Sequence, residues 1–308
     1  MDMATLTSIV AAVIVASTPL LFAALGELVT ERAGVLNLGV EGMMVMGAVV
    51  GFSVTYESDS HLLGVLASAA AGAMMALIFG VLTQLLLANQ VATGLALTMF
   101  GLGASALWGQ SYTGLSGKLM GNVDIPLLSE IPVIGPLLFR HDPMVYLCFV
   151  LLVAVWWFLT RTRKGMILRA VGENHGAAHA LGYRVVMVRL AAIMFGGACA
   201  GLGGAYLSIV QTPLWADGMT AGRGWIALAI VVFAAWRPWR AMAGAYLFGG
   251  VTVLQLHAQA MGIEIESQYM SMLPYLVTIV VLVAISHDPT RARMSAPGSL
   301  GKTFFSTS

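Results

Sequence analysis

Long apolar runs separated by short polar segments dominate the chain from Leu6 onward. A helix needs about 20 apolar residues to cross the hydrocarbon core of a bilayer, so runs of this length predict transmembrane helices. Nine runs approach that length, and they cover residues 6–28, 34–55, 62–87, 91–108, 144–160, 190–210, 224–236, 241–256 and 270–285. The seventh and eighth are short for full spans. The pattern predicts an all-α polytopic membrane protein with about nine transmembrane helices.

The one long polar stretch with a strong positive bias is residues 161–189, which read RTRKGMILRAVGENHGAAHALGYRVVMVR. Six of the chain's fifteen Lys and Arg residues lie in it. Because basic residues beside membrane spans remain in the cytoplasm, this stretch is predicted to be a cytoplasmic loop. It interrupts a transmembrane domain of residues 1–285, which we expect to be followed by a disordered cytoplasmic tail of residues 286–308.

The basic residues also predict how the chain is oriented. With residues 161–189 inside and the spans alternating, twelve Lys and Arg residues lie inside and three, Lys118, Arg140 and Arg223, lie outside. This asymmetry places the N-terminus outside and the C-terminus inside. The N-terminus carries Asp2 and no basic residue, so the first run is expected to be a retained span rather than a cleaved signal peptide.

The middle of the basic loop has the features of a short helix. Asn174 suits the N-cap, Ala177, Ala178 and Leu181 form a small apolar stripe, and Gly182 suits the C′ position. A short helix with small residues on the cytoplasmic face suits a docking partner. The alternative is a solvated loop that only sets the topology.

Composition agrees with a membrane protein and argues against other classes. Of the 308 residues, 59% are hydrophobic and 9% are charged, and the mean hydropathy is +0.88. A soluble domain carries about 25% charged residues. The net charge of +1 argues against a nucleic-acid partner. Cys148 and Cys199 fall inside apolar runs and are interpreted as small buried hydrophobic residues rather than a disulfide or a metal site.

Motifs for catalysis or metal binding are missing from the sequence. No set of His, Cys and carboxylate residues has metal-ligand spacing, and no Ser-His-Asp pattern is visible, so we expect no metal and no catalytic residues. Residues 296–303, APGSLGKT, match a loose P-loop pattern. A P-loop needs a strand before it and a helix after it, and the tail has room for neither, so the match is interpreted as chance.

Two carboxylates, Glu27 and Glu31, lie one helical turn apart near the end of the first apolar run. A carboxylate within an apolar span is costly and suggests a functional role by default. The favoured interpretation is a structural ion pair with Arg32 or Arg189 that pins the helix ends, rather than contact with a solute.

Further polar residues interrupt the second and fourth apolar runs. Asn37 and Glu41 are flanked by glycines that suggest an interrupted helix, which is where transporters often bind solute. Asn89, Gln90 and Thr93 break the pattern between the third and fourth runs and either line a cavity or form a tight polar turn.

Four segments of the chain resemble a known family of transport proteins. Residues 24–48, ALGELVTERAGVLNLGVEGMMVMGA, closely resemble the opening signature of nucleoside-type permeases, which belong to the ribose/branched-chain amino acid/nucleoside permease family of ABC importers. Residues 89–97, NQVATGLAL, resemble the second signature, and residues 222–250 resemble the C-terminal half. Residues 172–183, GENHGAAHALGY, resemble the cytoplasmic coupling-helix loop. The likeness extends from about Pro19 to the last span and implies a type II ABC importer-like permease.

The resemblance implies a set of partners. These are an ATPase that docks on the coupling helix, a periplasmic or lipid-anchored solute-binding protein, and a second permease subunit that is often a related but different chain. The bilayer is the bacterial inner (plasma) membrane. This chain is expected to bind no cofactor, because ATP and Mg would be bound by the partner ATPase.

The resemblance also suggests roles for three groups of residues. The solute path or gate is expected to be lined by Asn37, Glu41, Asn89, Gln90 and Thr93. The side that faces the binding protein is expected to carry Trp215, Arg223 and Trp225, although tryptophans near span ends are by default part of the aromatic belt. The residues expected to contact the ATPase are Gly172, Glu173, Gly176, Ala177, Ala178, Leu181, Gly182 and Tyr183.

The function that the sequence favours is therefore import of nucleosides or related purine or pyrimidine compounds, driven by ATP hydrolysis on a partner. Two alternatives remain open at this point. One is a permease of the same family for a simple sugar or a branched-chain amino acid. The other is a proton-coupled secondary carrier that uses Glu27 or Glu41.

Overall fold

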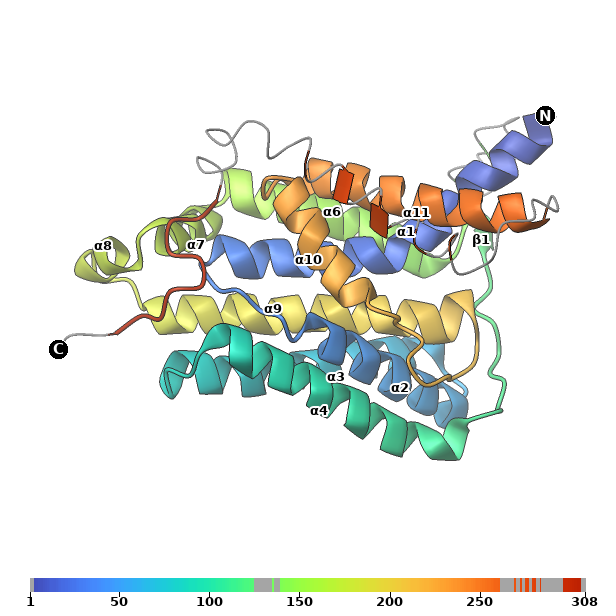
Figure 1. Ribbon diagram of the computed structural model, residues 1–308, viewed down its shortest axis with the longest axis horizontal. Coiled ribbons are helices and arrows are strands. Elements are labelled where there is room, and N and C mark those ends of the chain that lie inside the picture. The colour runs from blue at the N-terminus through green and yellow to red at the C-terminus, as the bar shows by residue number, and fades with distance from the viewer. Residues whose placement is uncertain are drawn as a thin grey trace.

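The computed structural model describes residues 3–124, 139–260 and 296–305, together with a few single residues between 135 and 283. The described part is a bundle of helices with one two-stranded ribbon (Figure 1). The long helices are α1 (Met3–Arg32), α2 (Val40–Ser58), α3 (His61–Gly80), α4 (Gln90–Gly109), α6 (Pro143–Arg161), α9 (Val185–Ala205) and α11 (Pro238–Ala260). The shorter ones are α7 (Arg163–Glu173), α8 (His175–Ala180) and α10 (Arg223–Phe233).

Short irregular elements connect these helices. π-Helical turns, η1 (Val81–Leu85) and η3 (Tyr206–Gln211), extend α3 and α9, and a 3-10 turn, η2 (Gln110–Tyr112), follows α4. Strands β1 (Val123–Asp124) and β2 (Arg140–His141) pair antiparallel, with Val123 opposite His141.

Six helical segments of the described residues are long and apolar enough to cross a membrane. They are Thr5–Arg32, His61–Leu85, Gln90–Tyr112, Pro143–Arg161, Val185–Gln211 and Pro238–Ala260. The second predicted span corresponds to α2, which begins at Val40 rather than at residue 34, and the seventh corresponds to the short helix α10. The ninth predicted span, residues 270–285, lies outside the described residues apart from isolated positions.

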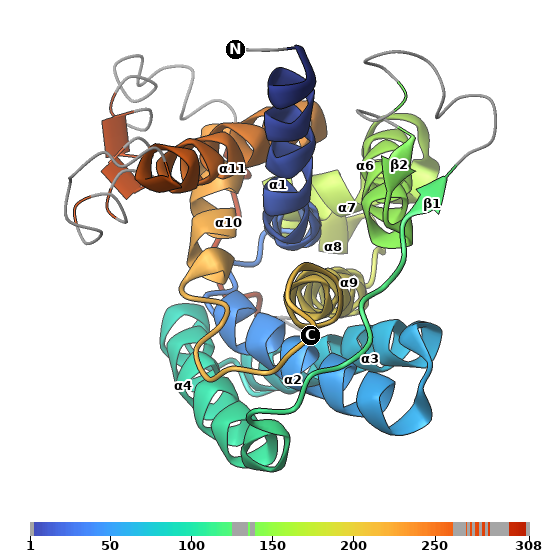
Figure 2. The same cartoon turned by 90° about the vertical axis from the view of Figure 1, so that its right-hand side faces the viewer.

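Helix α9 is the centre of the bundle, with α1 on one side and α2 and α3 on the other (Figure 2). Glycines make this close approach possible. A Cβ atom at Gly201 would overlap the carbonyl oxygen of Ser68, and one at Gly197 would overlap the carbonyl oxygen of Gly72. Small residues at such crossings let the helix backbones pack directly against each other in lipid. The Gly-rich part of the sixth predicted span thus packs directly against α3.

The basic loop contains the short helix that the sequence predicts. The Oδ1 atom of Asn174 accepts a hydrogen bond from the Ala177 amide at 3.0 Å, so Asn174 is the N-cap of α8. The backbone at Gly182 has φ +85°, the left-handed conformation that ends a helix. Earlier in the loop, the Thr162 hydroxyl caps α7 by accepting a hydrogen bond from the Gly165 amide at 3.0 Å. The prediction of a capped helix in this loop is confirmed.

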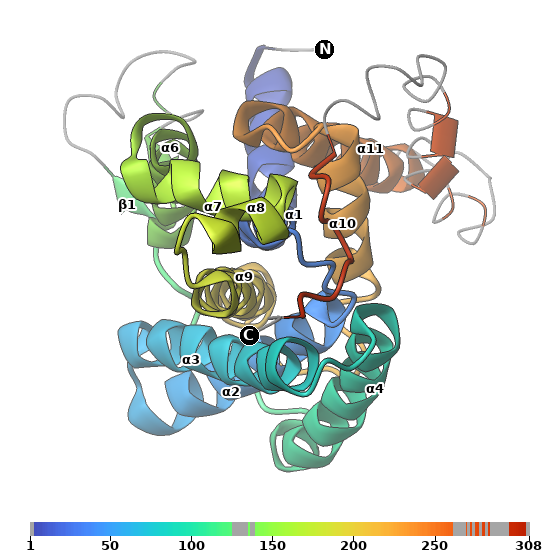
Figure 3. The same cartoon turned by 90° about the vertical axis from the view of Figure 1, so that its left-hand side faces the viewer.

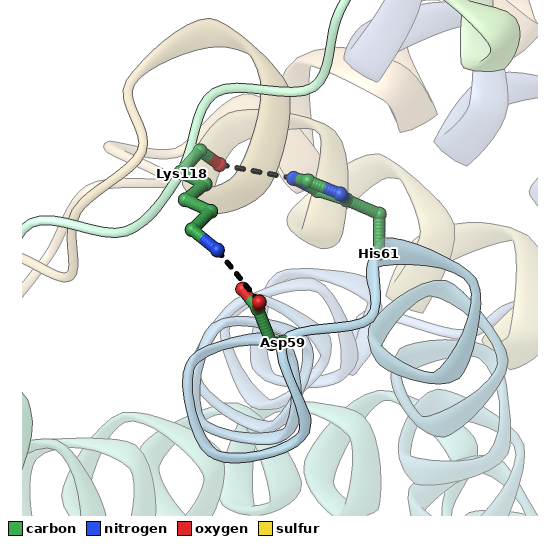
Figure 4. Close-up of polar contacts among 3 residues, drawn as sticks. All are labelled: Asp59, His61 and Lys118. Atoms are coloured by element: carbon green, nitrogen blue, oxygen red, sulfur yellow. Dashed lines mark hydrogen bonds and ion pairs between the residues drawn. The ribbon is translucent and has the colours of Figure 1, made fainter.

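At the opposite end of the bundle, the chain after α4 is fixed to the turn between α2 and α3. Lys118 Nζ lies 2.6 Å from Asp59 Oδ2, and the Lys118 carbonyl lies 2.9 Å from His61 Nε2 (Figure 4). Lys118 and Asp59 thus form an ion pair between the two loops. Both side chains are largely exposed, so the pair is expected to contribute at most about 1 kcal/mol. The ion pair therefore holds the loop after α4 in position and adds little to the stability of the bundle.

The prediction of a disordered tail is wrong for residues 296–305. This segment forms a turn and then runs beside α7 and α8 (Figures 1 and 3). Ala296 and Leu300 pack against the main hydrophobic core, and Phe304 is 7% exposed. Sequence patterns gave no sign of this, because the segment is short and its apolar residues have no helical or strand periodicity.

Candidate functional site

The predicted interruption between the first two helices is present as residues 33–39. Buried side chains hold its backbone. Glu27 Oε1 accepts from the Asn37 amide at 3.2 Å, and Asn37 Oδ1 accepts from the Gly39 amide at 2.9 Å. Gln90 Oε1 accepts from the Leu36 amide at 2.9 Å. Asn37 and Gln90 are both buried, so in the described structure they shape the non-helical segment instead of presenting a polar surface.

Glu41 forms a polar clamp on the start of α10. Its Oε1 atom accepts from the Thr220 hydroxyl at 2.6 Å and from the Gly222 amide at 2.8 Å, and its Oε2 atom accepts from the Gly224 amide at 2.6 Å. The first amides of a helix have no partner within the helix, and the positive end of the helix dipole favours an anion there. Glu41 is 3% exposed. Its carboxylate therefore acts as the N-terminal cap of α10 from a helix far away in sequence.

Glu27 and Glu31 do not form the ion pairs that the sequence suggested. Glu31 Oε2 accepts from the indole nitrogen of Trp236 at 2.5 Å, whereas Arg32 donates to the Trp236 carbonyl at 3.1 and 3.2 Å. Glu27 Oε2 and Glu31 Oε1 are buried without a hydrogen-bond partner among the described residues. The ion-pair interpretation is wrong, because Arg32 bonds to the Trp236 carbonyl and Arg189 bonds to carbonyl oxygens, Gln84 and His175 instead of a carboxylate.

The polar residues before α4 form a turn. Asn89 is exposed, and its Oδ1 atom accepts from the Ala92 amide at 3.0 Å, which makes it the N-cap of α4. Thr93 is half-buried one turn further on. The alternative of a tight polar turn is therefore the one that the geometry supports for Asn89. Of the five residues assigned to the solute path, Asn37 and Gln90 both bond to the segment 33–39. Glu41, in α2, bonds instead to the start of α10.

The residues assigned to the binding-protein side differ in exposure. Trp215 is 2% exposed and packs with Val49 and Phe52, so it offers no surface to a partner. Arg223 is half-buried and donates to the Met219 carbonyl at 2.8 Å. Trp225 is 42% exposed and is the one of the three with substantial free surface. The position of Trp215 near a span end does not reveal that its own loop packs this side chain against α2.

The loop with α8 separates its assigned residues into two faces. Ala178 is 2% exposed and Gly172 is buried, with no room for a Cβ beside the Arg32 carbonyl. Leu181 is 77% exposed. The other exposed members are Glu173, Gly176, Ala177 and Gly182, and Tyr183 is half-buried. The assignment of Ala178 and Gly172 to an outer contact is wrong, because both pack against the protein itself. The exposed face of α8 carries mostly small side chains and almost no charge.

Arg189 connects this loop to the spans, a role that the sequence did not reveal. Its guanidinium is fully buried, with Nε 3.2 Å from the Ala33 carbonyl and Nη1 3.5 Å from Gln84 Oε1. Nη2 lies 3.2 Å from Nδ1 of His175 at the start of α8. Burial lowers the pKa of His175 below its usual range, and the neighbouring charges of Arg189 and Lys302 lower it further. The sequence offers only a basic residue directly before an apolar run, which predicts a topological signal or an ion pair with Glu27 or Glu31.

A groove of about 680 Å³ lies between α6, α7 and α9. Its walls are almost entirely apolar and include Trp157, Phe158, Met187 and Phe195. None of the residues assigned to the solute path lines it. Its chemistry suits acyl chains and does not suit a polar solute.

These features, a bundle of membrane-spanning helices with a capped helix on its basic loop, agree with one family. Residues 9–282 match the family described as the branched-chain amino acid transport system / permease component. The chain belongs to this permease family. It is a multi-pass membrane protein and a permease component of an ABC transporter, which in bacteria lies in the inner membrane. The alternative of a proton-coupled secondary carrier is thereby excluded.

Individual relatives cover nearly the whole chain. A putative glucose ABC transporter permease protein, TsgC13 of Haloferax volcanii, is 38% identical over 95% of this chain and 96% of its own length. The nucleoside ABC transporter permease protein NupC of Lactococcus lactis is 36% identical over 90% and 92%. The guanosine ABC transporter permease protein NupQ of Bacillus subtilis is 33% identical over 90% and 91%. No solved structure gives a significant match. Permeases of this family are transport subunits rather than enzymes, and the family implies an ATPase and a solute-binding protein as partners.

Proposed function

We propose that this chain moves nucleosides, or related purine or pyrimidine compounds, inward across the membrane. The observation that carries the proposal is the likeness to two permeases named for such solutes, NupC and NupQ, over nine-tenths of the chain. The nucleoside-type signature at residues 24–48 supports it. In the structure this signature forms the end of α1, the segment 33–39 and the start of α2, including the Glu41 clamp.

The driving force is ATP hydrolysis on a partner ATPase that binds ATP and Mg, while this chain binds no cofactor of its own. The free face of α8 supports this arrangement. It is separated from the spans, capped at Asn174, and presents Leu181 between small residues. A partner can approach such a helix closely, and a single exposed leucine can supply the anchoring contact.

The same loop also bears on the orientation of the chain in the membrane. We propose about nine spans with the N-terminus outside and the C-terminus inside. Residues 296–305 contact α7 and α8, so the tail lies on the same side as the basic loop. This contact supports the proposal that the C-terminus is inside. The binding protein would then approach the opposite side of the membrane, with the exposed Trp225 as its proposed contact.

The second permease subunit is proposed to be a related but different chain. Bacillus subtilis has two guanosine ABC transporter permease proteins that both resemble this one, NupQ and NupP, the latter at 23% identity over 87% of this chain. A pair of related permeases for one named solute is the expected pattern of a heterodimer.

A sugar is the competing solute, because the relative TsgC13 is named as a putative glucose permease. Uptake of labelled guanosine and of labelled glucose, in cells with and without the intact transport system, separates the two. We expect loss of high-affinity guanosine uptake with glucose uptake unchanged. Loss of glucose uptake alone would overturn the nucleoside assignment and leave the family assignment intact.

Docking of the ATPase is tested separately from the solute. Leu181→Asp places a charge on the exposed face of α8, and we expect co-purification of the ATPase and uptake to fall together. Leu119→Asp is the matched control, since Leu119 is a similarly exposed leucine, at 62%, in the loop at the other end of the bundle. A Leu181→Asp protein that keeps its ATPase would show that α8 is not the contact.

A further inference from the structure

The C-terminal segment 296–305 is bonded to the junction between α7 and α8. The Ser299 amide donates to the Gly172 carbonyl at 2.8 Å, and the Ser299 hydroxyl donates to the Glu173 carbonyl at 3.3 Å. The same hydroxyl oxygen accepts from the His175 amide at 3.2 Å. One serine thus bonds to the last residues of α7 and the first residue of α8, which fixes the angle between the two helices.

Phe304 covers the inner face of α8. It belongs to a small hydrophobic cluster that is separate from the main core. The cluster consists of Val171, Ala178, Val185 and Phe304. The ring of Phe304 also makes edge contacts with His175 and His179, each at 5.3 Å between ring centroids. The next residue, Phe305, is 66% exposed, so only one of the two phenylalanines is used in this packing.

Arg189 joins the tail to the spans. Its Nη1 atom donates to the Lys302 carbonyl at 3.0 Å, in addition to its contact with His175 in α8. The same guanidinium bonds to the Ala33 carbonyl just after α1 and to Gln84 in η1 after α3. Tail, α8 and the ends of two spans therefore meet at one buried cation, and a shift of α8 cannot leave these bonds unchanged.

We propose that residues 296–305 are a strut that sets the orientation of α8 and, through Arg189, couples it to α1 and α3. The ATPase docks on the outer face of α8 and not on the tail. The tail does not cover the proposed docking face. Phe304 packs on the side of α8 that carries Ala178, while Leu181, on the other side, stays 77% exposed. The proposal rests on the proposed function, since it assumes that an ATPase binds α8.

The test compares two neighbouring substitutions in the full chain, expressed with its partners and placed in lipid nanodiscs. Phe304→Ala removes the packed ring, and Phe305→Ala removes the exposed one. Hydrogen–deuterium exchange of the α8 amides, retention of the ATPase, and solute uptake are measured for both. For Phe304→Ala we expect exchange in α8 to rise by roughly tenfold or more, because local opening follows the loss of packing. Uptake should fall with it, while Phe305→Ala resembles the wild type.

Two results overturn the strut. One is a Phe304→Ala protein with unchanged α8 exchange and unchanged uptake. The other is the reverse order, with Phe305→Ala the more harmful for ATPase retention, since the tail would then be the docking surface itself. Ser299→Ala supplies the same comparison through the hydrogen bonds if Phe304→Ala fails to express. Failure of the proposed function is distinct, because wild-type protein would then retain no ATPase, while the exchange difference between the variants would still report on the strut.

Discussion

The Glu41 clamp allows the sharpest test of how this bundle is held together. Glu41→Gln preserves the shape of the side chain but replaces one carboxylate oxygen by an NH2 group, which cannot accept a hydrogen bond. With the remaining oxygen on the Thr220 hydroxyl and the Gly222 amide, the new NH2 group faces the Gly224 amide, donor against donor. The negative charge at the N-terminus of α10 is also lost.

The magnitude follows from these contacts. A hydrogen bond to a charged group contributes about 1.5–3 kcal/mol, and an anion at a partly buried helix N-terminus up to about 2 kcal/mol. Loss of one such bond together with the charge predicts a destabilisation of about 2–4 kcal/mol for Glu41→Gln. Glu41→Ala removes all three acceptor contacts and is expected to be worse.

The assay is thermal unfolding of purified protein in detergent, followed by size-exclusion chromatography after heating. Glu57→Gln is the control on the same helix, because Glu57 is an exposed carboxylate that bonds only to the Tyr112 hydroxyl among the described residues. We expect a clearly lower midpoint for Glu41→Gln and nearly no change for Glu57→Gln. Unchanged stability of Glu41→Gln would refute the clamp, and unchanged stability with lost uptake would return Glu41 to the solute path.

Three further predictions concern packing, topology and pH. Gly201→Leu is expected to abolish folded protein, judged by expression and monodispersity, because its side chain overlaps the Ser68 backbone, whereas Gly103→Leu, with nothing within 4 Å of an added Cβ, is tolerated. Single cysteines at Ser116 and Leu181 are expected to label from opposite sides of intact cells, and labelling of both from outside contradicts the orientation. The lowered pKa of His175 means that the folded chain resists protonation there, so α8 is expected to lose stability as pH falls below about 6.5, where the unfolded chain gains the proton. Exchange of the α8 amides measured against pH should show this loss, and a His175→Gln variant should not.

The sequence by itself determined the class of protein and the elements of the loop. Apolar runs locate helices well because a bilayer leaves the backbone no other way to satisfy its hydrogen bonds. Six of the predicted spans have counterparts of membrane-crossing length in the described residues, and the N-cap Asn174 and the C′ residue Gly182 were both identified correctly. Capping is local, since donor and acceptor lie within three residues, so the pattern of residues is sufficient to predict it.

Tertiary structure decided which polar residues are structural and which faces are free. Glu41 caps a helix that begins 182 residues later, at Arg223. Arg189 bonds to Ala33 just after α1, to Gln84 in η1 and to the tail. Contacts of this sequence separation leave no periodic signal. The same holds for Ala178 and Trp215, which carry the residue types of a docking surface and an aromatic belt. Ala178 packs with Phe304, and Trp215 packs against α2. A side chain's burial depends on what folds over it, and only the arrangement of the helices supplies that.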